Sequence, residues 1–440
     1  MSNKLEEARK IINEVDAQMA ELFVKRMKAA ELVCEHKMEF GLPILDQKRE
    51  DAVIEQNSAL INDEVLKGYY IDYLKHLMSV SRAYQYRIQS GERVAHNGLE
   101  GAIHINLGED SYDILVERGI LKNASQYLNL DRRVLVVTDS GVPEQYAKAI
   151  AEQCKEGIIY TVEQGEASKS LDTFGKLLQT MLDHGFSRKD CVVAVGGGVV
   201  GDLSGFAASA YMRGIDFYNI PTTLLAQIDS SIGGKTAINL GGVKNIVGAF
   251  YQPKMVLIDP ELLETLPQRQ ISNGLAEAIK MSLTSDEKLF ELIENEDIES
   301  NIDEVIIRSL NIKKSVVEQD ERESGLRKIL NFGHTIGHGI ESSARMTSLF
   351  HGECVALGMI PMCSERIRDR VVCVLKKCNL YNTPDYDWDK IAEAAFHDKK
   401  ADGDTVTVTT VNQIGSFEMK KMRCLEVIAL ARKVLEESQK

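Results

Sequence analysis

The 440-residue chain has little positive charge for its size. Its 52 lysines and arginines are outnumbered by 66 aspartates and glutamates, which gives a formal net charge of −14. Proteins that bind nucleic acid usually present a basic surface to the phosphate backbone, so the acidic balance argues against a nucleic-acid partner. Local lysines and arginines can still bind a small anion. The 44% hydrophobic content can fill ordinary cores, and the length suits two or three domains.

Features of export and of membrane insertion are also lacking. No stretch approaches the roughly 20 apolar residues that a membrane-spanning helix needs, and the opening MSNKLEEARK has no apolar signal-peptide core. The eight cysteines form no C-x-x-C pair, and several lie in apolar runs where buried free thiols are expected. We therefore expect a protein of the reducing cytoplasm that has no membrane partner.

Hydrophobic periodicity divides the chain into three predicted domains. Over residues 1–90, apolar residues recur at intervals of three and four, which predicts three amphipathic helices from Leu5, over 47–61 and over 64–88. Such a thin unit buries little core alone, so a homodimer is expected. Residues 99–260 predict an α/β domain with parallel strands near 134–138, 157–162, 191–195, 217–220 and 255–258. Residues 261–440 predict a mostly helical domain with one extended piece near 405–411.

The segment CVVAVGGGVVGDL is the first sign of chemistry. An apolar strand at 191–195 runs into Gly196, Gly198 and Gly201, the spacing of a dinucleotide-binding turn in which a helix N-terminus faces the phosphates. Glycine-rich turns of this kind that bind no ligand are about as common as those that bind one. Further on, DSSIGGKT resembles the end of a phosphate loop, but Asp229 occupies the position of its first glycine. Lys235 can still bind an anion, or it can be a solvated lysine beside a glycine turn.

Three histidines indicate a metal site. His334 and His338 lie four residues apart, on one face of a predicted helix, and His351 follows in LFHGECVALG. A catalytic zinc typically takes three protein ligands, so spacing alone favours His334 and His338, with His351 or a carboxylate as the third. Glu277 and Lys280 share another helical face in NGLAEAIKMSL, where a surface salt bridge is the alternative to a functional role.

Together these segments resemble the 3-dehydroquinate synthase family from about Ala102 to Gly415. The motifs GGGVVGD, IPTTLLAQIDSSIGGKT, GGVKNIVGAF, GLAEAIK, DERESGLRKILNFGHTIGH and HGECVALGM occur in the family's order. The resemblance implies an α/β dinucleotide-binding domain, a mostly helical metal-binding domain, NAD and zinc, although cobalt or manganese suits similar ligands. It also implies that Glu277, His334 and His351 bind the metal. His338 is then left for the substrate, which replaces the choice made from spacing.

The same resemblance assigns the remaining site residues. It implies cofactor contacts at Asp139, Glu166, Lys169, Gly197, Gly198, Val199, Asp202, Thr222, Thr223, Lys244 and Thr265. It implies catalytic groups at Lys235, Lys280, Glu323, Arg327, Asn331 and His338. Further substrate contacts fall on Arg213, Asp229, Asn245, Lys313 and either Lys399 or Lys400, and Arg213 matches an arginine that can reach a neighbouring subunit's site.

The implied reaction converts 3-deoxy-D-arabino-heptulosonate 7-phosphate into 3-dehydroquinate and phosphate. Hydride passes to NAD and later returns, while the metal stabilises the developing alkoxide. The resemblance implies that Lys235 holds the substrate carboxylate. It also implies that Arg327, Lys313 and His338 cradle the phosphate.

The first ninety residues carry a second polar pattern. Eight polar residues at or near the apolar stripes resemble the helical chorismate mutases across Leu5 to Ile88, namely Arg9, Arg26, Lys37, Asp46, Arg49, Glu50, Ser81 and Gln85. The resemblance implies an intertwined dimer whose site takes one arginine from the partner chain. Such a site converts chorismate to prephenate by positioning and electrostatic stabilisation alone. To donate a hydrogen bond to the ether oxygen of chorismate, Glu50 needs a proton, unless another group donates to that oxygen.

The sequence therefore predicts a chorismate mutase fused to a 3-dehydroquinate synthase. Three alternatives stay open. The larger part can be a sister cyclase that acts on an uncarboxylated sugar phosphate, or a metal-dependent polyol dehydrogenase. The first ninety residues can be a non-catalytic dimerisation or chorismate-sensing module. If they are a mutase domain, we further hypothesise that they sense chorismate and report its level to the synthase.

Overall fold

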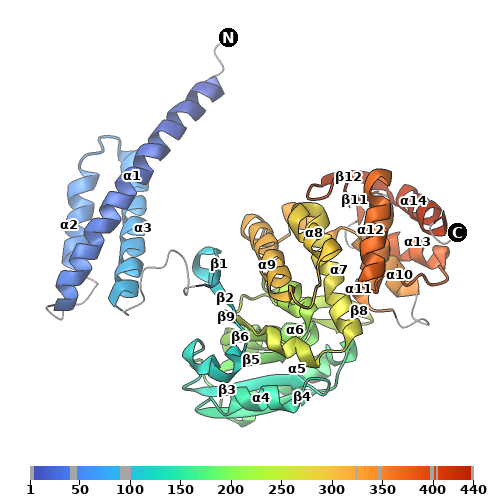
Figure 1. Ribbon diagram of the computed structural model, residues 1–440. Coiled ribbons are helices and arrows are strands. Elements are labelled where there is room, and N and C mark those ends of the chain that lie inside the picture. The colour runs from blue at the N-terminus through green and yellow to red at the C-terminus, as the bar shows by residue number, and fades with distance from the viewer. Residues whose placement is uncertain are drawn as a thin grey trace. The chain divides into compact units, whose positions relative to one another are not determined.

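The computed structural model describes residues 4–39, 47–89, 101–323, 325–343, 349–396, 401–402 and 405–437. Asp46, Lys399 and Lys400, which were predicted to bind substrates, lie outside these residues. The chain divides into two compact units, residues 1–97 and 98–440 (Figure 1). No described helix has both the length and the apolar character needed to cross a membrane. All eight cysteines are free thiols.

The first unit consists of α1 (Lys4–Glu39), α2 (Gln47–Ser58) and α3 (Glu64–Gln89), which confirms the three predicted helices. Its small core includes Ala30, Leu74 and Met78. From residue 4 to residue 25, every described side chain of α1 is exposed, including the apolar Val15 and Leu22 at 47% and 64%. Figure 1 shows this half of α1 extending beyond α2 and α3. Its apolar stripe is therefore not covered by the described residues of its own unit.

The second unit is built on a seven-stranded sheet in the order β1-β2-β9-β6-β5-β3-β4. Strands β2, β9, β6, β5, β3 and β4 run parallel, and β1 pairs antiparallel with β2. The strands are β1 (Ile103–Ile105), β2 (Tyr112–Val116), β3 (Arg133–Asp139), β4 (Glu156–Val162), β5 (Cys191–Gly196), β6 (Asp216–Pro221) and β9 (Met255–Ile258).

Helices cover both faces of this sheet. On one face, α4 (Glu144–Ala151) packs against β3, β5 and β6 through residues such as Ile150 and Val193. On the other, α5 (Leu171–Asp183) and α6 (Gly198–Ala210) pack through Leu177 and Leu203. The chain leaves β3 toward the edge strand β4 and returns to β5 on the other side of β3. In such sheets ligands bind where the order reverses, at the carboxyl ends of the strands, which here are β3 and β5.

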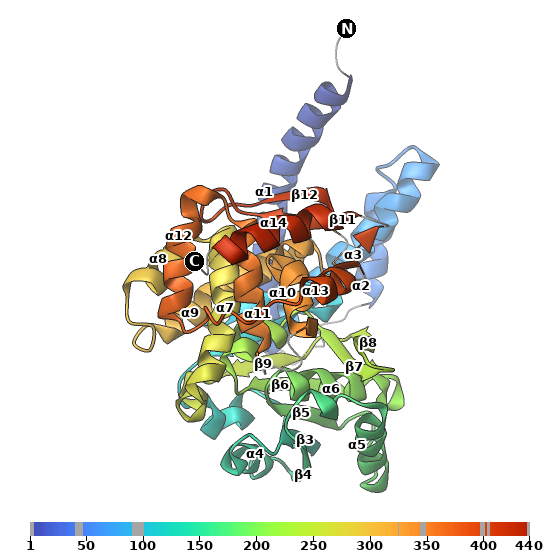
Figure 2. The same cartoon turned by 90° about the vertical axis from the view of Figure 1, so that its right-hand side faces the viewer.

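The rest of the second unit is mostly helical and lies to one side of the sheet in both views (Figures 1 and 2). It contains α7 (Gln268–Ser285), α8 (Glu287–Asn295), α9 (Ile302–Gln319), α10 (His334–Ser343), α11 (His351–Met359), α12 (Glu365–Lys377), α13 (Trp388–Phe396) and α14 (Cys424–Glu437). A small antiparallel sheet joins β10 (Ala401–Asp402), β11 (Thr405–Thr410) and β12 (Glu418–Arg423). One large core, which includes Phe290 and Phe332, fills this region.

The predicted fold class is confirmed, and all five predicted parallel strands are present. The prediction missed β1, β2, β12 and a hairpin formed by β7 (Lys235–Leu240) and β8 (Val243–Phe250). Strand β8 is mostly exposed, so it has no apolar run that would identify it from sequence. This hairpin carries Lys235, Lys244 and Asn245, which the sequence resemblance assigns to the active site.

Candidate active sites

The glycine-rich turn lies at the predicted position, between β5 and α6. None of Gly196, Gly197 and Gly198 has a positive φ, so the backbone conformation does not require glycine here. Glycine is required because there is no room for a side chain. A Cβ atom on Gly196 would lie 2.6 Å from Cγ2 of Val200, and one on Gly198 would lie 2.9 Å from Oγ of Ser230. The turn therefore leaves backbone N–H groups open at the start of α6, where an anionic group can be bound.

Other predicted cofactor residues gather round this turn. Thr222 donates its backbone N–H to the carbonyl of Gly196 at 3.0 Å, and a Cβ on Gly197 would lie 3.2 Å from Cγ2 of Thr223. Asp139 ends β3, and burial raises the pKa of its carboxyl. Val199 follows in the first turn of α6. Thr265 differs, because its hydroxyl lies 2.9 Å from that of Tyr146 and no described contact joins it to the cluster.

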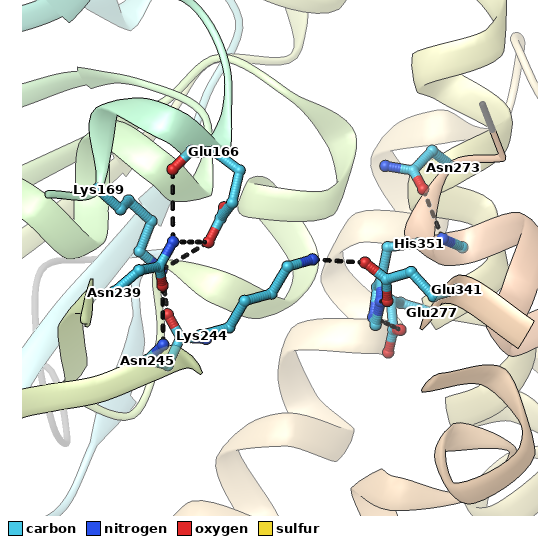
Figure 3. A network of polar contacts seen from close by, with 10 residues as sticks. Glu166, Lys169, Asn239, Lys244, Asn245, Asn273, Glu277, Glu341 and His351 are labelled. Carbon is cyan, nitrogen blue, oxygen red and sulfur yellow. Dashed lines mark hydrogen bonds and ion pairs between the residues drawn. The ribbon is translucent and has the colours of Figure 1, made fainter. Parts of the chain in front are cut away.

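Lys169 is the centre of a polar network beside the turn. Its Nζ lies 2.6 Å from Oδ2 of Asp202 and also contacts Oδ1 of Asn245. Burial raises the pKa of Asp202 to about 6, although the Lys169 ammonium opposes this shift. The sequence prediction missed Asn239, whose side chain bonds both Glu166 at 2.8 Å and the backbone N–H of Asn245 at 2.8 Å (Figure 3). Asn239 thus ties the β7–β8 hairpin to the other predicted cofactor residues.

Three histidines and one buried carboxylate converge in the helical region. His334 begins α10, His338 lies one turn later, His351 begins α11, and their ligand atoms all lie within 4.8 Å of one another. Glu277 on α7 is 1% exposed, and its Oε1 lies 3.7 Å from Nε2 of both His334 and His351. Its other oxygen contacts Lys280. The pair of Glu277 and Lys280 is therefore a buried pair, and the surface salt bridge is ruled out.

Hydrogen bonds orient two of these imidazoles for metal binding. Nδ1 of His334 lies 3.1 Å from the carbonyl oxygen of Phe332, which can only accept, so this nitrogen carries the proton. Nδ1 of His351 lies 3.1 Å from a carboxylate oxygen of Glu341 in the same way. Nε2 is the other ring nitrogen, and in both residues it lies 3.7 Å from Oε1 of Glu277. Two imidazoles and a carboxylate are a donor set that suits zinc or cobalt.

A group of buried cations lies next to this cluster. Lys280, Lys313 and Arg327 are 1%, 6% and 2% exposed. Lys313 contacts Asp229, whose pKa is lowered because that ammonium outweighs the effect of burial. The Nε atom of Arg327 is buried without a hydrogen-bond partner in the described structure. Glu277 and Asp229 pair with Lys280 and Lys313, so these three cations face two carboxylates. Because buried charge is costly unless it is paired, the positive charge in excess suits an anionic ligand.

The glycine loop brings Lys235 to the same region. Lys235 contacts Glu323, which also accepts a hydrogen bond from Nδ2 of Asn331 at 2.8 Å. Gly233 has φ +90°, and a Cβ there would lie 2.3 Å from Nη2 of Arg327, so only glycine fits. The loop leads into the strand β7 and not into a helix, which agrees with the sequence argument against a Walker loop.

Backbone strain concentrates at predicted site residues. Of the five described non-glycine residues with positive φ, three are Arg213 at 70°, Asn245 at 53° and Glu323 at 59°. Such conformations cost free energy and persist mainly where the surrounding structure imposes them, often at functional sites. Arg213 is exposed on a short turn after α6.

The first unit contains a separate pocket of about 410 Å³. Six of the eight residues predicted for chorismate line it, namely Arg26, Lys37, Arg49, Glu50, Ser81 and Gln85. Arg26 contacts the hydroxyl of Ser81 across α1 and α3. Arg9 lies on the exposed half of α1 and is not among the described residues that line this pocket.

Arg82 is a residue of this pocket that the sequence prediction missed. It lines the cavity and forms an ion pair with Glu50, from α3 to α2. No motif signals it, because the two residues are 32 positions apart. The pocket therefore holds Arg26, Lys37, Arg49 and Arg82 as cations and Glu50 as an anion, a balance that suits a ligand with more than one carboxylate.

Comparisons with known proteins agree with this geometry. The family model for 3-dehydroquinate synthase N-terminal matches residues 159–273, that for 3-dehydroquinate synthase C-terminal matches 274–401, and that for chorismate mutase type II matches 8–86. A 3-dehydroquinate synthase of Streptococcus thermophilus is 39% identical over 347 residues, which cover 74% of this chain and 98% of that protein. One of Pelobacter propionicus is 40% identical over 350 residues, with the same coverage of 74% and 98%.

Two solved structures resemble the larger unit. A 2-deoxy-scyllo-inosose synthase complexed with carbaglucose-6-phosphate, NAD+ and Co2+ has a TM-score of 0.69 at 27% identity, covering 76% of this chain and 100% of that chain. The 2-epi-5-epi-valiolone synthase of Streptomyces hygroscopicus subsp. jinggangensis, with NAD+ and Zn2+ bound, has a TM-score of 0.68 at 30% identity, covering 76% and 99%.

Residues 98–440 therefore have the fold of the dehydroquinate synthase-like cyclases. Within that class, the chain belongs to the 3-dehydroquinate synthase family, and its N-terminal helices form a chorismate mutase type II domain. The predicted fusion of two enzymes is confirmed at the level of the families.

The buried lysine cluster predicts a pH dependence of anion binding. Burial lowers the pKa of Lys313 to about 8, and the charge of Arg327 acts in the same direction. Lys313 is charged below this pH and neutral above it, so the affinity for inorganic phosphate should fall as the pH rises from 7.5 to 9.5. Calorimetric titration of the full-length protein would measure this. The Lys313→Arg variant should keep its affinity over that range, and an equal fall in both proteins would contradict the assignment.

Proposed function

We propose that the larger unit converts 3-deoxy-D-arabino-heptulosonate 7-phosphate into 3-dehydroquinate and phosphate. The observation that carries this proposal is the buried cation group of Lys280, Lys313 and Arg327 beside the cluster of Glu277 and the histidines. A phosphorylated, carboxylated sugar supplies two anionic groups to such a site. The 3-dehydroquinate synthases of Streptococcus thermophilus and Pelobacter propionicus support the same substrate.

A divalent metal is proposed to bind Glu277, His334 and His351, because these three groups converge and both Nε2 atoms face the carboxylate. When bound, the metal supplies Lewis-acid stabilisation of a substrate alkoxide. Two cyclases of similar structure hold Co2+ and Zn2+, which supports either ion. His338 stands close to the metal ligands, with its ring centroid 5.3 Å from that of His334, and is then available to the substrate.

NAD is proposed to bind at the carboxyl ends of β3 and β5, where it would supply hydride-transfer chemistry. The turn at Gly197 and Gly198 would hold the pyrophosphate at the N-terminus of α6. Lys169, kept in place by Asp202 and Asn245, adds a positive charge nearby. Both cyclases of similar structure contain NAD+.

The chain's own residues are proposed to orient the substrate. Lys235, with Glu323 and Asn331, would hold the carboxylate, while Arg327, Lys313 and His338 would bind the phosphate. These ammonium and guanidinium groups act by charge and by fixed direction, since they are already ordered by Asp229, Glu323 and the backbone. Buried side chains exclude water from this half of the site, which strengthens each charge interaction.

The sister cyclase is the second candidate for the larger unit. It is favoured by the structural likeness to the inosose and valiolone synthases. The higher identity of 39% to a 3-dehydroquinate synthase, together with the position of Lys235, favours the carboxylated substrate. A polyol dehydrogenase would release NADH with each turnover, whereas the proposed reaction returns its hydride.

The N-terminal unit is proposed to convert chorismate to prephenate. Arg26 and Arg49 would bind carboxylates in the pocket, and Lys37 would face the ether oxygen that gains negative charge. Arg82 places a permanently charged donor beside Glu50, so the pocket does not depend on a protonated Glu50 to donate to that oxygen. This arrangement favours a catalytic domain over a module that only binds.

The N-terminal unit is further proposed to work as a dimer. The exposed apolar half of α1, with Val15 and Leu22, needs a cover, and a second copy of this helix offers a matching apolar surface. Arg9 lies on that half. It would then enter the pocket of the partner, which explains why it does not line the pocket of its own chain.

The synthase activity has a direct test. The full-length chain with NAD should release phosphate from 3-deoxy-D-arabino-heptulosonate 7-phosphate without net NADH, and removal of metal by a chelator should abolish the release until zinc is restored. Glu277→Gln should lower the rate by about 10²-fold or more, because it weakens the metal site. Absence of release from the metal-loaded and NAD-loaded protein, with turnover of an uncarboxylated sugar phosphate, would instead establish a sister cyclase.

The shared mutase site predicts complementation between two inactive variants. Arg9→Ala and Arg49→Ala should each lose most chorismate conversion, and co-expression of the two should restore part of it, because a mixed dimer contains one pocket with both arginines. The control pairs Arg26→Ala with Arg49→Ala, which line one pocket and should not complement. Failure of the first pair to complement, in mixed dimers isolated by two affinity tags, would contradict the placement of Arg9.

A further inference from the structure

Glu341, on α10, joins two parts of the larger unit. Its Oε2 lies 3.1 Å from Nδ1 of His351, and its Oε1 accepts a hydrogen bond from Nζ of Lys244 at 2.6 Å. His351 begins α11, whereas Lys244 lies on β8, in the hairpin that also carries Asn245. Figure 3 shows Lys244 extending from this hairpin to Glu341, beside His351 and Glu277. Neither the motifs nor the spacing of the sequence had indicated Glu341.

Lys244 and His351 both contact the carboxyl group of Glu341. Burial opposes its ionisation, but the hydrogen bond from His351 and the ammonium of Lys244 outweigh burial and hold its pKa well below the usual range. The side chains of Glu341 and His351 are 24% and 31% exposed, so water screens the interaction only in part. At 3.1 Å from this carboxyl oxygen, Nδ1 is placed to donate a hydrogen bond to Glu341, which turns Nε2 to the opposite side of the ring, toward Glu277.

The backbone around His351 is fixed independently of Glu341. Gly352 donates its N–H to Oδ1 of Asn273 at 2.6 Å, and Phe350 donates its N–H to Oε2 of Glu353 at 2.7 Å. These contacts anchor the start of α11, but they do not set the rotation of the imidazole about its side-chain bonds. The hydrogen bond to Glu341 directs Nδ1 away from Glu277 and so sets this rotation.

We propose that Glu341 is a positioning residue for metal binding, which holds the His351 imidazole with Nε2 toward Glu277 and is itself held by Lys244 of the β8 strand. The inference rests on the proposed metal site. A carboxylate on the second nitrogen of a metal-binding histidine fixes its orientation and makes it a better ligand. Because Lys244 comes from the hairpin of the cofactor side, the quality of the metal site depends on both sides of the active site.

The test measures the metal affinity of the metal-stripped full-length protein. Co2+ is titrated and followed by its visible absorption, and Zn2+ affinity is measured by competition with a chromophoric chelator. Glu341→Gln, which keeps an acceptor but loses the charge, should weaken binding by about 10-fold, and Glu341→Ala by up to about 100-fold. Lys244→Met should weaken it by less than about fivefold, because this lysine is 59% exposed and acts only through Glu341.

A matched control is Asp303→Asn, which removes a carboxylate from an exposed ion pair with Arg118 and should leave metal affinity unchanged. The Co2+ absorption of Glu341→Ala should also change shape, since a freely rotating His351 alters the coordination. Each metal-free variant should remain folded at the temperature of the titration, which its melting curve checks. A Glu341→Ala protein whose affinity falls while its Co2+ absorption keeps the parent's shape would show a merely structural role and overturn the proposal.

The test distinguishes a failure of the proposed metal site from a failure of the positioning role of Glu341. If the parent protein binds neither ion, or binds them equally well after Glu277→Gln, the proposed metal site is wrong. If the parent binds and Glu277→Gln does not, but both Glu341 variants keep the parent's affinity and spectrum, the metal site stands and the positioning role of Glu341 is overturned.

Discussion

The buried carboxylate of Glu277 is the constraint on which the helical region depends. It is 1% exposed, and a charge so far from water is tolerated only when opposite charge or ligand atoms surround it. Lys280 from the same helix, His334 from α10 and His351 from α11 meet this need. Three helices must therefore pack so that their polar groups meet at one point, and the large apolar core around them holds that arrangement.

The β7–β8 hairpin connects the polar groups around Glu277 with the carboxyl edge of the sheet. The hairpin starts at Lys235, near the buried cations, and its second strand carries Lys244 toward Glu341 and Asn245 toward Lys169. This short hairpin thus contacts residues that are proposed to bind the cofactor, the substrate and the metal. This arrangement explains why the glycine loop before it is tight: with φ +90° and Arg327 so close, Gly233 leaves no room for a side chain.

The N-terminal unit depends on a different balance. Its described core is small, and the exposed apolar half of α1 exceeds what a thin helical unit can cover by itself. Six of the residues predicted for chorismate line the charged pocket, Arg9 does not line it, and Asp46 lies outside the described residues. In the proposed mutase, activity and dimerisation are thus linked, because the exposed apolar surface is also the segment that carries Arg9.

Periodic and local features could be predicted from the sequence. The five parallel strands and the three N-terminal helices follow from apolar runs and intervals, and the glycine turn follows from spacing. Spacing alone favoured His334 and His338 as metal ligands, which stays a prediction beside the proposed set of Glu277, His334 and His351. The proximity of Glu277 to two distant histidines leaves no local pattern in the sequence. Asn239 and Glu341 were missed for the same reason, since their partners lie 73 and 97 positions away. The exposed β8 strand has no alternation of apolar and polar residues that would identify it as a strand from the sequence.

X-ray absorption at the metal edge of the cobalt-loaded or zinc-loaded full-length protein tests the central claim most directly. The imidazole contribution to the spectrum counts the histidine ligands. Two imidazoles and one protein carboxylate are expected, from His334, His351 and Glu277, with His338 left for the substrate. Three imidazoles with no carboxylate would place His338 on the metal and contradict the assignment of the active site.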